Sequence, residues 1–167
     1  GDVVGPTVFG HNGAADAISV GAVRFNTVSA PEFFSSRGPV THYFGPVSGA
    51  TPAASLGSPE VLAKPDLTAT DGGATTFFGA FLGGVWRFFG TSASAPHAAA
   101  VAALMQDADP TLEPAQIRTA LAASARPVGL FGPNAVGAGL IDAYEALEEV
   151  ADPLGPGEEE GGGEESG

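Results

Sequence analysis

The sequence has 167 residues, of which 44% are hydrophobic, with 25 glycines, 14 prolines and no cysteine. This length and apolar content suit a single folded domain and exclude a wholly disordered chain, while the lack of cysteine excludes a disulfide scaffold, a thiolate metal site and a cysteine nucleophile. The net charge of −13 gathers in residues 141–167, where acidic side chains occur without any basic one, so the mildly acidic remainder offers no surface for nucleic acid.

The first ninety residues are expected to form short strands joined by long loops. Residues 17–23 (AISVGAV) are a β-rich run bounded by glycine and polar residues, which predicts a strand. Residues 31–60 are dense in glycine, proline and serine and predict a loop with at most one short strand. A second strand is predicted at residues 64–69, running into a turn at 71–73. Residues 74–90, rich in phenylalanine and glycine, predict a loop that packs aromatic side chains.

The following segment is expected to be helical. A helix starts at Thr91, and because residues 93–106 are nearly all small or apolar, most of its circumference should be buried. A second helix is predicted over residues 114–125, with proline at its first position and Gln116 reaching back to the cap. A third begins near Asp142, a good N-cap residue, and continues to about Val150.

The last residues, 152–167, combine proline, glycine and glutamate and cannot bury apolar surface. They predict a disordered acidic linker or tail. The predicted folded part is therefore residues 1–151. No stretch approaches the ~18 uninterrupted apolar residues of a membrane span.

One short segment carries recognisable chemistry, residues 90–97 (GTSASAPH). It places Ser92 after a flexible glycine at the N-terminus of the long helix. The unpaired N–H groups of the first turn and the helix dipole favour negative charge there. The N–H of Ser92 can then stabilise the oxyanion that forms when its own hydroxyl attacks a carbonyl group. Composition alone would favour the alternative, a serine that only caps a core helix.

The GTSASAPH segment resembles the nucleophile signature of the subtilisin-like (S8) serine proteases, with Ser92 as the attacking residue. Four further segments resemble family segments in the family's order: residues 18–23 (ISVGAV), 34–39 (FSSRGP), 64–69 (KPDLTA) and 139–143 (GLIDA). The resemblance implies a three-layer α/β fold with a mostly parallel sheet, of which this chain is the C-terminal half. The implied reaction is peptide-bond hydrolysis through an acyl-enzyme on Ser92.

The sequence departs from the family pattern in two ways. Thr70-Asp71-Gly72 stands where the family usually has Ala-Pro-Gly, and we attribute Asp71 to turn formation. In the family, the aspartate block, the His-Gly-Thr block and the asparagine of the oxyanion hole all precede the region covered here. We therefore expect the catalytic histidine and aspartate to lie outside this chain, which would be inactive in isolation.

None of the three histidines is a convincing base for Ser92. His97 lies five positions after Ser92, about 140° round the helix, so its ring should point away and be structural. His42 is interpreted as a solvated loop residue. His11 falls where the family often lines its primary specificity pocket, and both pocket lining and an ordinary loop position remain open.

No cofactor is expected from the sequence. The glutamates of residues 158–165 are interpreted as a charged linker, and no residue pattern forms a calcium loop. Because family members often bind structural calcium, the resemblance leaves such an ion open for the full-length protein. The resemblance implies polypeptide substrates, a requirement for the N-terminal half of the domain, and a secreted or cell-surface location.

Three alternatives remain at this stage. Sedolisin-like proteases share a related serine signature and use a glutamate base, although His97 and the FSSRGP and KPD segments argue against them. A non-catalytic scaffold would keep the fold and use it for binding. A gene fragment would have no separate function. An isolated half domain should also expose one sheet edge and apolar surface, which predicts poor solubility or partial unfolding.

Overall fold

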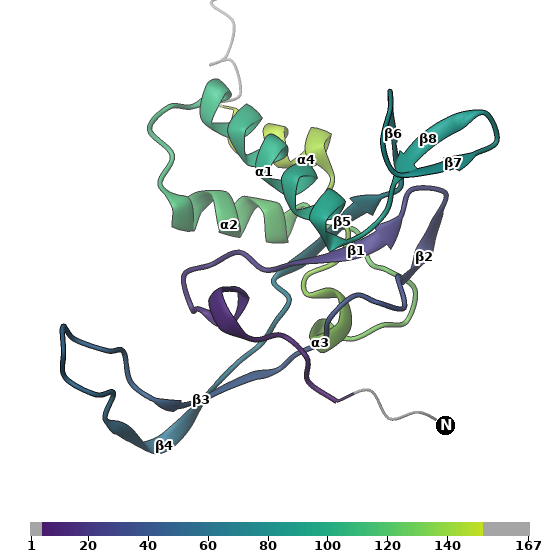
Figure 1. The fold of residues 1–167 in the computed structure, drawn as a ribbon. Helices are drawn as coiled ribbons and strands as arrows, with labels where there is room; N and C mark the ends of the chain where they lie inside the picture. Colours follow the sequence, from purple (N-terminus) through teal and green to yellow (C-terminus); the bar gives the residue numbers. More distant parts are fainter. Residues whose placement is uncertain (1–4, 152–167) are drawn as a thin grey trace, which may run out of the picture.

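Two parallel strands, β1 (Val20–Arg24) and β5 (Leu67–Asp71), form the centre of the fold in the computed structural model, which describes residues 5–151. Val20 is paired with Leu67 and Arg24 with Asp71. Strand β2 (Thr27–Pro31) adds to the free side of β1 in the antiparallel sense, so the sheet order is β2-β1-β5 (Figure 1). The strands predicted at 17–23 and 64–69 are confirmed, within a mixed sheet.

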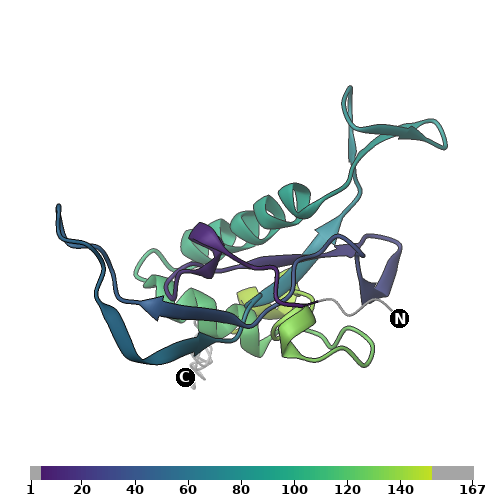
Figure 2. The same cartoon turned by 60° about the horizontal axis from the view of Figure 1, so that its bottom comes forward.

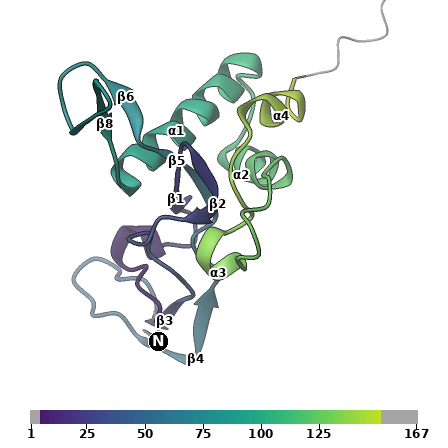
Figure 3. The same ribbon diagram turned by 90° about the vertical axis from the view of Figure 1, so that its right-hand side faces the viewer.

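One face of this sheet carries the larger core. Helix α1 (Thr91–Ala108) packs across β1 and β5, and α2 (Pro114–Ala123) and α4 (Ala143–Glu148) pack beside it (Figure 3). The side chains buried there come from β5 and from all three helices: Leu67, Ala69, Ala98, Val101, Met105, Ile117, Ala120, Leu121 and Ala146. Small residues on α1 let the helix approach the sheet closely.

The opposite face is covered by the irregular segment that follows α2. Val23 of β1 packs there against Val128 and against α3 (Pro133–Val136), a short helix that the sequence did not predict. The Thr68 hydroxyl donates to the Gly139 carbonyl at 2.9 Å and ties this segment to β5. The fold is therefore a layered α/β structure, as expected.

Local capping explains where the shorter helices begin. The Gln116 side chain accepts from the backbone N–H of Glu113 at 2.8 Å, which completes the capping box expected at the start of α2. The Asp142 carboxylate accepts from the N–H groups of Tyr144 and Glu145 at 3.1 and 3.4 Å and caps α4. Both predicted helix starts are confirmed.

Two arms extend away from the central sheet (Figure 2). One is an antiparallel pair of β3 (Val40–Phe44) and β4 (Ser55–Leu62). The other is a three-stranded antiparallel sheet of β6 (Gly73–Thr75), β7 (Ala80–Leu82) and β8 (Val85–Phe88), in the order β6-β8-β7. The predicted loops at 31–60 and 74–90 were therefore wrong. Their residues are mostly exposed and lack the alternation that marks a half-buried strand.

Helix α1 is buried on one face only, which corrects the prediction of burial round most of its circumference. Its buried residues are Ala93, Ser94, Ala98, Val101 and Met105, whereas Leu104 is half exposed.

A small 3₁₀ helix, η1 (Gly10–Gly13), lies near the start of the described chain. Large apolar side chains such as Phe33 and Leu130 are almost fully exposed. The acidic tail predicted at 152–167 lies outside the described residues.

Candidate functional site

Ser92 occupies the first turn of α1, with its side chain exposed. The helix starts after Gly90, whose φ of 126° is a left-handed conformation that glycine adopts without strain. The Gly90 carbonyl accepts from the N–H groups of Ala93 and Ser94 at 2.9 and 3.3 Å. Because the first N–H groups of a helix have no partner within the helix, the N–H of Ser92 lies where an anion would be stabilised.

Asp71 is positioned differently from the prediction, which assigned it to a local turn. It ends β5, its side chain is completely buried, and its Oδ2 accepts the backbone N–H of Gly90 at 2.8 Å. This hydrogen bond spans 19 residues and reaches the residue that caps α1. The turn interpretation was wrong. Residues 71–73 have a composition typical of a turn, but Asp71 ends strand β5 and its side chain bonds to a residue distant in the sequence. The KPDLTATD segment provided no signal of that contact.

The chain approaching Ser92 is also held by the glycine that follows Asp71. The Gly72 N–H donates to the Phe88 carbonyl at 2.8 Å, and the Gly72 carbonyl accepts from Arg87 at 2.9 Å. Gly72 has a φ of 74°, and a Cβ there would lie 2.6 Å from the Phe89 ring. A side chain at this position would therefore push on the segment that leads into α1.

His97 does not face Ser92. Its ring Nδ1 lies 2.6 Å from the Thr70 carbonyl, so it ties α1 to the end of β5. This contact agrees with the structural role expected for His97. Because a carbonyl only accepts, Nδ1 donates in this contact and the lone pair of the ring lies on Nε2, which faces Gly73 at the start of β6.

The two other histidines also lie elsewhere. His42 belongs to strand β3 rather than to a loop, and its Nδ1 lies 3.2 Å from a carboxylate oxygen of Glu60 on β4. His11 is exposed within η1. Within residues 5–151, therefore, no histidine forms a pair with Ser92.

The model of the subtilase family matches residues 6–143, which is most of the chain. The chain belongs to the subtilase family. The match includes the segments that carry the sequence resemblance, from the strand at residues 18–23 to the serine signature. No curated protein sequence matches the chain significantly.

Solved protease structures share the fold of this subtilase chain. The CspB protease of Clostridium perfringens is similar with a TM-score of 0.57 and 24% identity, over 81% of this chain and 27% of that protein. The prenylagaramide maturation protease PagA is similar with a TM-score of 0.52 and 21% identity, over 84% of this chain and 44% of that protein. The subtilase chain thus spans less than half the length of either neighbour. The similarity to these two neighbours therefore shows a shared fold.

A cavity of about 170 Å³ opens beside the residue before Ser92 in the subtilase chain. It is lined by Thr91 and Pro65 together with residues 7–9, Asn12, Ser19, Val20 and Ser36. His11 is not among its lining residues, although Phe9 and Asn12 are. The structure therefore places His11 outside this cavity.

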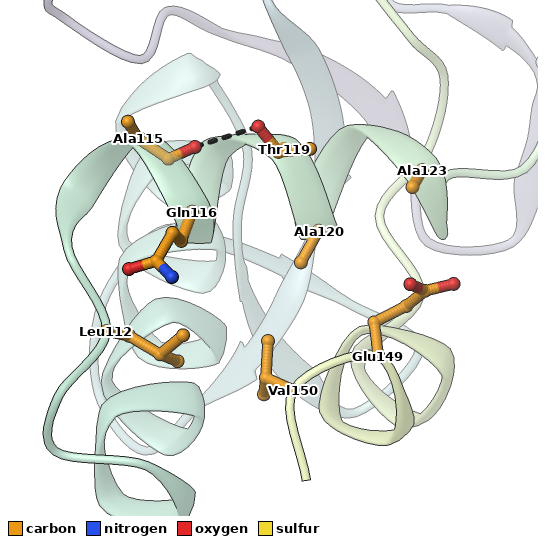
Figure 4. Close-up of a pocket in the computed structure, with 8 residues that line it drawn as sticks. All are labelled: Leu112, Ala115, Gln116, Thr119, Ala120, Ala123, Glu149 and Val150. Carbon is orange, nitrogen blue, oxygen red and sulfur yellow. Dashed lines mark hydrogen bonds between the residues drawn. The ribbon is translucent and has the colours of Figure 1, made fainter. Parts of the chain in front are cut away.

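A second hollow, of about 450 Å³, lies between α2 and the end of α4 (Figure 4). Its lining is small and apolar apart from Gln116, Thr119 and Glu149, and the Thr119 hydroxyl donates to the carbonyl of Ala115 at 2.9 Å. It contains neither Ser92 nor a histidine. This hollow is therefore not a candidate for the protease chemistry.

Residues 5–151 contain no group of three or more His, Asp or Glu side chains that could hold a metal ion. In the same part of the subtilase chain, no helix has the length and apolarity to cross a membrane.

The aromatic residues before Ser92 divide into two sets. Phe88 and Phe89 are half-buried near the start of α1, whereas Phe77, Phe78, Phe81 and Trp86 are exposed on the β6-β8-β7 arm.

Proposed function

We propose that a longer protein containing this chain is a serine endopeptidase, which hydrolyses peptide bonds through an acyl-enzyme on Ser92. The observation that carries the proposal is the position of Ser92. It is the exposed serine of the family signature, in the first turn of α1, beside N–H groups that have no partner within the helix.

In the first step, the Oγ of Ser92 attacks the carbonyl carbon of the scissile bond and transfers its proton to a histidine. The carbonyl oxygen becomes an oxyanion, which accepts a hydrogen bond from the N–H of Ser92. The C–N bond then breaks, and the leaving amine takes the proton from the histidine. A water molecule, deprotonated by the same histidine, then attacks the acyl carbon. The bond to Oγ breaks, and the histidine returns the proton to the Oγ of Ser92.

The histidine and its orienting aspartate are proposed to come from residues outside these 167. Within residues 5–151 the Ser92 hydroxyl makes no hydrogen bond to a histidine: Nδ1 of His97 lies against the Thr70 carbonyl, and Nδ1 of His42 lies against Glu60. A serine hydroxyl without an adjacent base is a weak nucleophile. The 167-residue chain by itself should therefore give no measurable turnover.

The experiment is labelling of the full-length protein with a fluorophosphonate probe, followed by location of the label by peptide mass spectrometry. We expect label on Ser92 and its loss in Ser92→Ala. The matched control is Ser94→Ala, which removes a buried hydroxyl from the same helical turn. Ser94→Ala should leave the label on Ser92, because the Ser94 hydroxyl does not reach the surface.

The result also separates the protease from a binding scaffold of the same fold. A folded full-length protein that takes no label, and that cleaves no denatured protein substrate, would exclude an activated serine. That outcome would favour the non-catalytic alternative. Label on Ser92 in the wild type and in Ser94→Ala would establish the nucleophile.

A further inference from the structure

We propose that Asp71 is a positioning residue, whose buried carboxylate holds the N–H of Gly90 and thereby fixes the start of α1 for the reaction at Ser92. This inference rests on the proposed function of Ser92. It concerns a residue that differs from the family's usual Ala-Pro-Gly pattern and that does not itself touch the substrate. The carboxylate is completely buried, and its Oδ2 lies 2.8 Å from the Gly90 nitrogen.

The start of α1 lacks the side-chain cap that most helices have. Its N-cap residue is glycine and no side chain of the cap accepts from the first turn, in contrast to Asp142 at the start of α4. The Gly90 carbonyl is bonded to Ala93 and Ser94. With the N–H of Gly90 held by Asp71, both backbone polar groups of Gly90 are engaged, and the direction of the first turn is set.

The chemistry of Asp71 argues against a role in packing alone. Its second carboxylate oxygen, Oδ1, is buried without a hydrogen-bond partner in the described chain. Burying an unsatisfied carboxylate oxygen is unfavourable, whereas an apolar residue of similar volume would avoid the penalty. In a buried site, where water does not compete, the hydrogen bond from the Gly90 N–H to Oδ2 is electrostatically stronger than it would be in water. The buried carboxylate of Asp71 therefore restrains the backbone of Gly90 strongly.

The restraint matters because the oxyanion must meet the N–H of Ser92 at hydrogen-bond distance. Gly90 has no side chain to restrict its backbone angles, and its φ of 126° is one that other residues rarely adopt. A small rotation at Gly90 would move the first turn of α1 and the Ser92 N–H with it. Misplacement of a catalytic group by about 1 Å costs on the order of 100-fold in rate.

The test compares three variants of the full-length protein. Asp71→Leu removes the acceptor at similar volume, and Asp71→Asn keeps an oxygen that can accept from Gly90. The matched control is Thr68→Val, which removes a buried hydrogen bond from the same strand, to Gly139 rather than to the α1 start. Each is measured for kcat and KM on a peptide substrate and for the rate of fluorophosphonate labelling, both corrected for the folded fraction.

We expect Asp71→Leu to lower kcat and the labelling rate by about 100-fold with little change in KM, because substrate binding is retained while the oxyanion donor is displaced. Asp71→Asn should restore most of the rate, and Thr68→Val should behave as wild type. If Asp71→Leu reacts as fast as Thr68→Val, or if Asp71→Asn is as slow as Asp71→Leu, the proposal is overturned.

Hydrogen–deuterium exchange of the peptide covering residues 88–95 provides a readout that does not depend on activity. Asp71→Leu should accelerate exchange in this peptide, and Thr68→Val should not. A wild type that takes no label would refute the proposed function, whereas unchanged exchange in Asp71→Leu would refute the role of Asp71. The two failures are therefore distinguishable.

Discussion

A buried ion pair next to β5 allows a quantitative test of what holds the described chain together. The Lys64 ammonium, whose side chain is only 2% exposed, lies 2.7 Å from Oδ2 of Asp66 and donates to the Ala17 carbonyl at 2.6 Å. The Asp66 carboxylate also accepts the N–H of Ser19 at 2.6 Å and lies 3.3 Å from Arg118. One carboxylate thus connects β5, the start of β1 and helix α2.

Removal of the Asp66 carboxylate should destabilise the folded protein more than removal of the Lys64 ammonium. Asp66→Ala leaves the buried ammonium of Lys64 with only the Ala17 carbonyl and leaves the N–H of Ser19 without its acceptor. Removing one partner of a buried pair costs about 3–5 kcal/mol of unfolding free energy. Lys64→Met should cost less, about 1–3 kcal/mol, because Asp66 keeps its bonds to Ser19 and Arg118.

Urea unfolding of the full-length protein measures these differences, in a Ser92→Ala background that prevents self-cleavage. The double variant Lys64→Met/Asp66→Leu should recover part of the loss seen in Asp66→Ala, because no buried charge remains unpaired. A loss below about 1 kcal/mol in Asp66→Ala would refute the reasoning. So would a double variant whose loss equals the sum of the two single losses.

Two further predictions concern the surface of the chain. The Thr111 hydroxyl and the Thr111 N–H both donate to the Asp109 carboxylate and hold its pKa below the ordinary value of 3.8. The contribution of these bonds to folding stability is therefore present above the unfolded-state pKa, and it is lost as the pH falls through the lowered folded-state pKa. Thr111→Val should raise the Asp109 pKa in an NMR titration, and an unchanged pKa would contradict this cause. Residues 1–151 expressed alone should bind a hydrophobic dye and aggregate, because side chains such as Phe33 and Leu130 are exposed, at 93% and 104%. A compact monomer that unfolds cooperatively in gel filtration and urea experiments would refute that expectation.

Local patterns determined much of the fold. The β-rich run at 18–23 became β1 because its alternate residues are buried on two faces of the sheet. The starts of α2 and α4 were predictable because capping depends on residues three positions apart or fewer. The position of Ser92 at the start of a helix followed from the GTSASAPH segment for the same reason.

The sequence was less informative where strands pair only with each other. The β3-β4 and β6-β8-β7 arms carry exposed aromatic and aliphatic residues, so no periodic burial marks them as strands. The face of α1 that carries Leu104 looks like core in the sequence, yet it is uncovered in the described residues. Which apolar face is covered depends on what packs against it, and this information is not local.

The sequence by itself determined the family and the helix that carries Ser92, and it predicted Ser92 as the nucleophile, because these depend on neighbouring residues and on an ordered set of short motifs. Only the tertiary structure showed the contact of Asp71 with the start of α1, because the hydrogen bond from Gly90 joins residues 19 positions apart. It likewise assigned His97 to the Thr70 carbonyl, across 27 positions. Contacts of this kind arise when β5 and α1 pack together, and no local pattern encodes them.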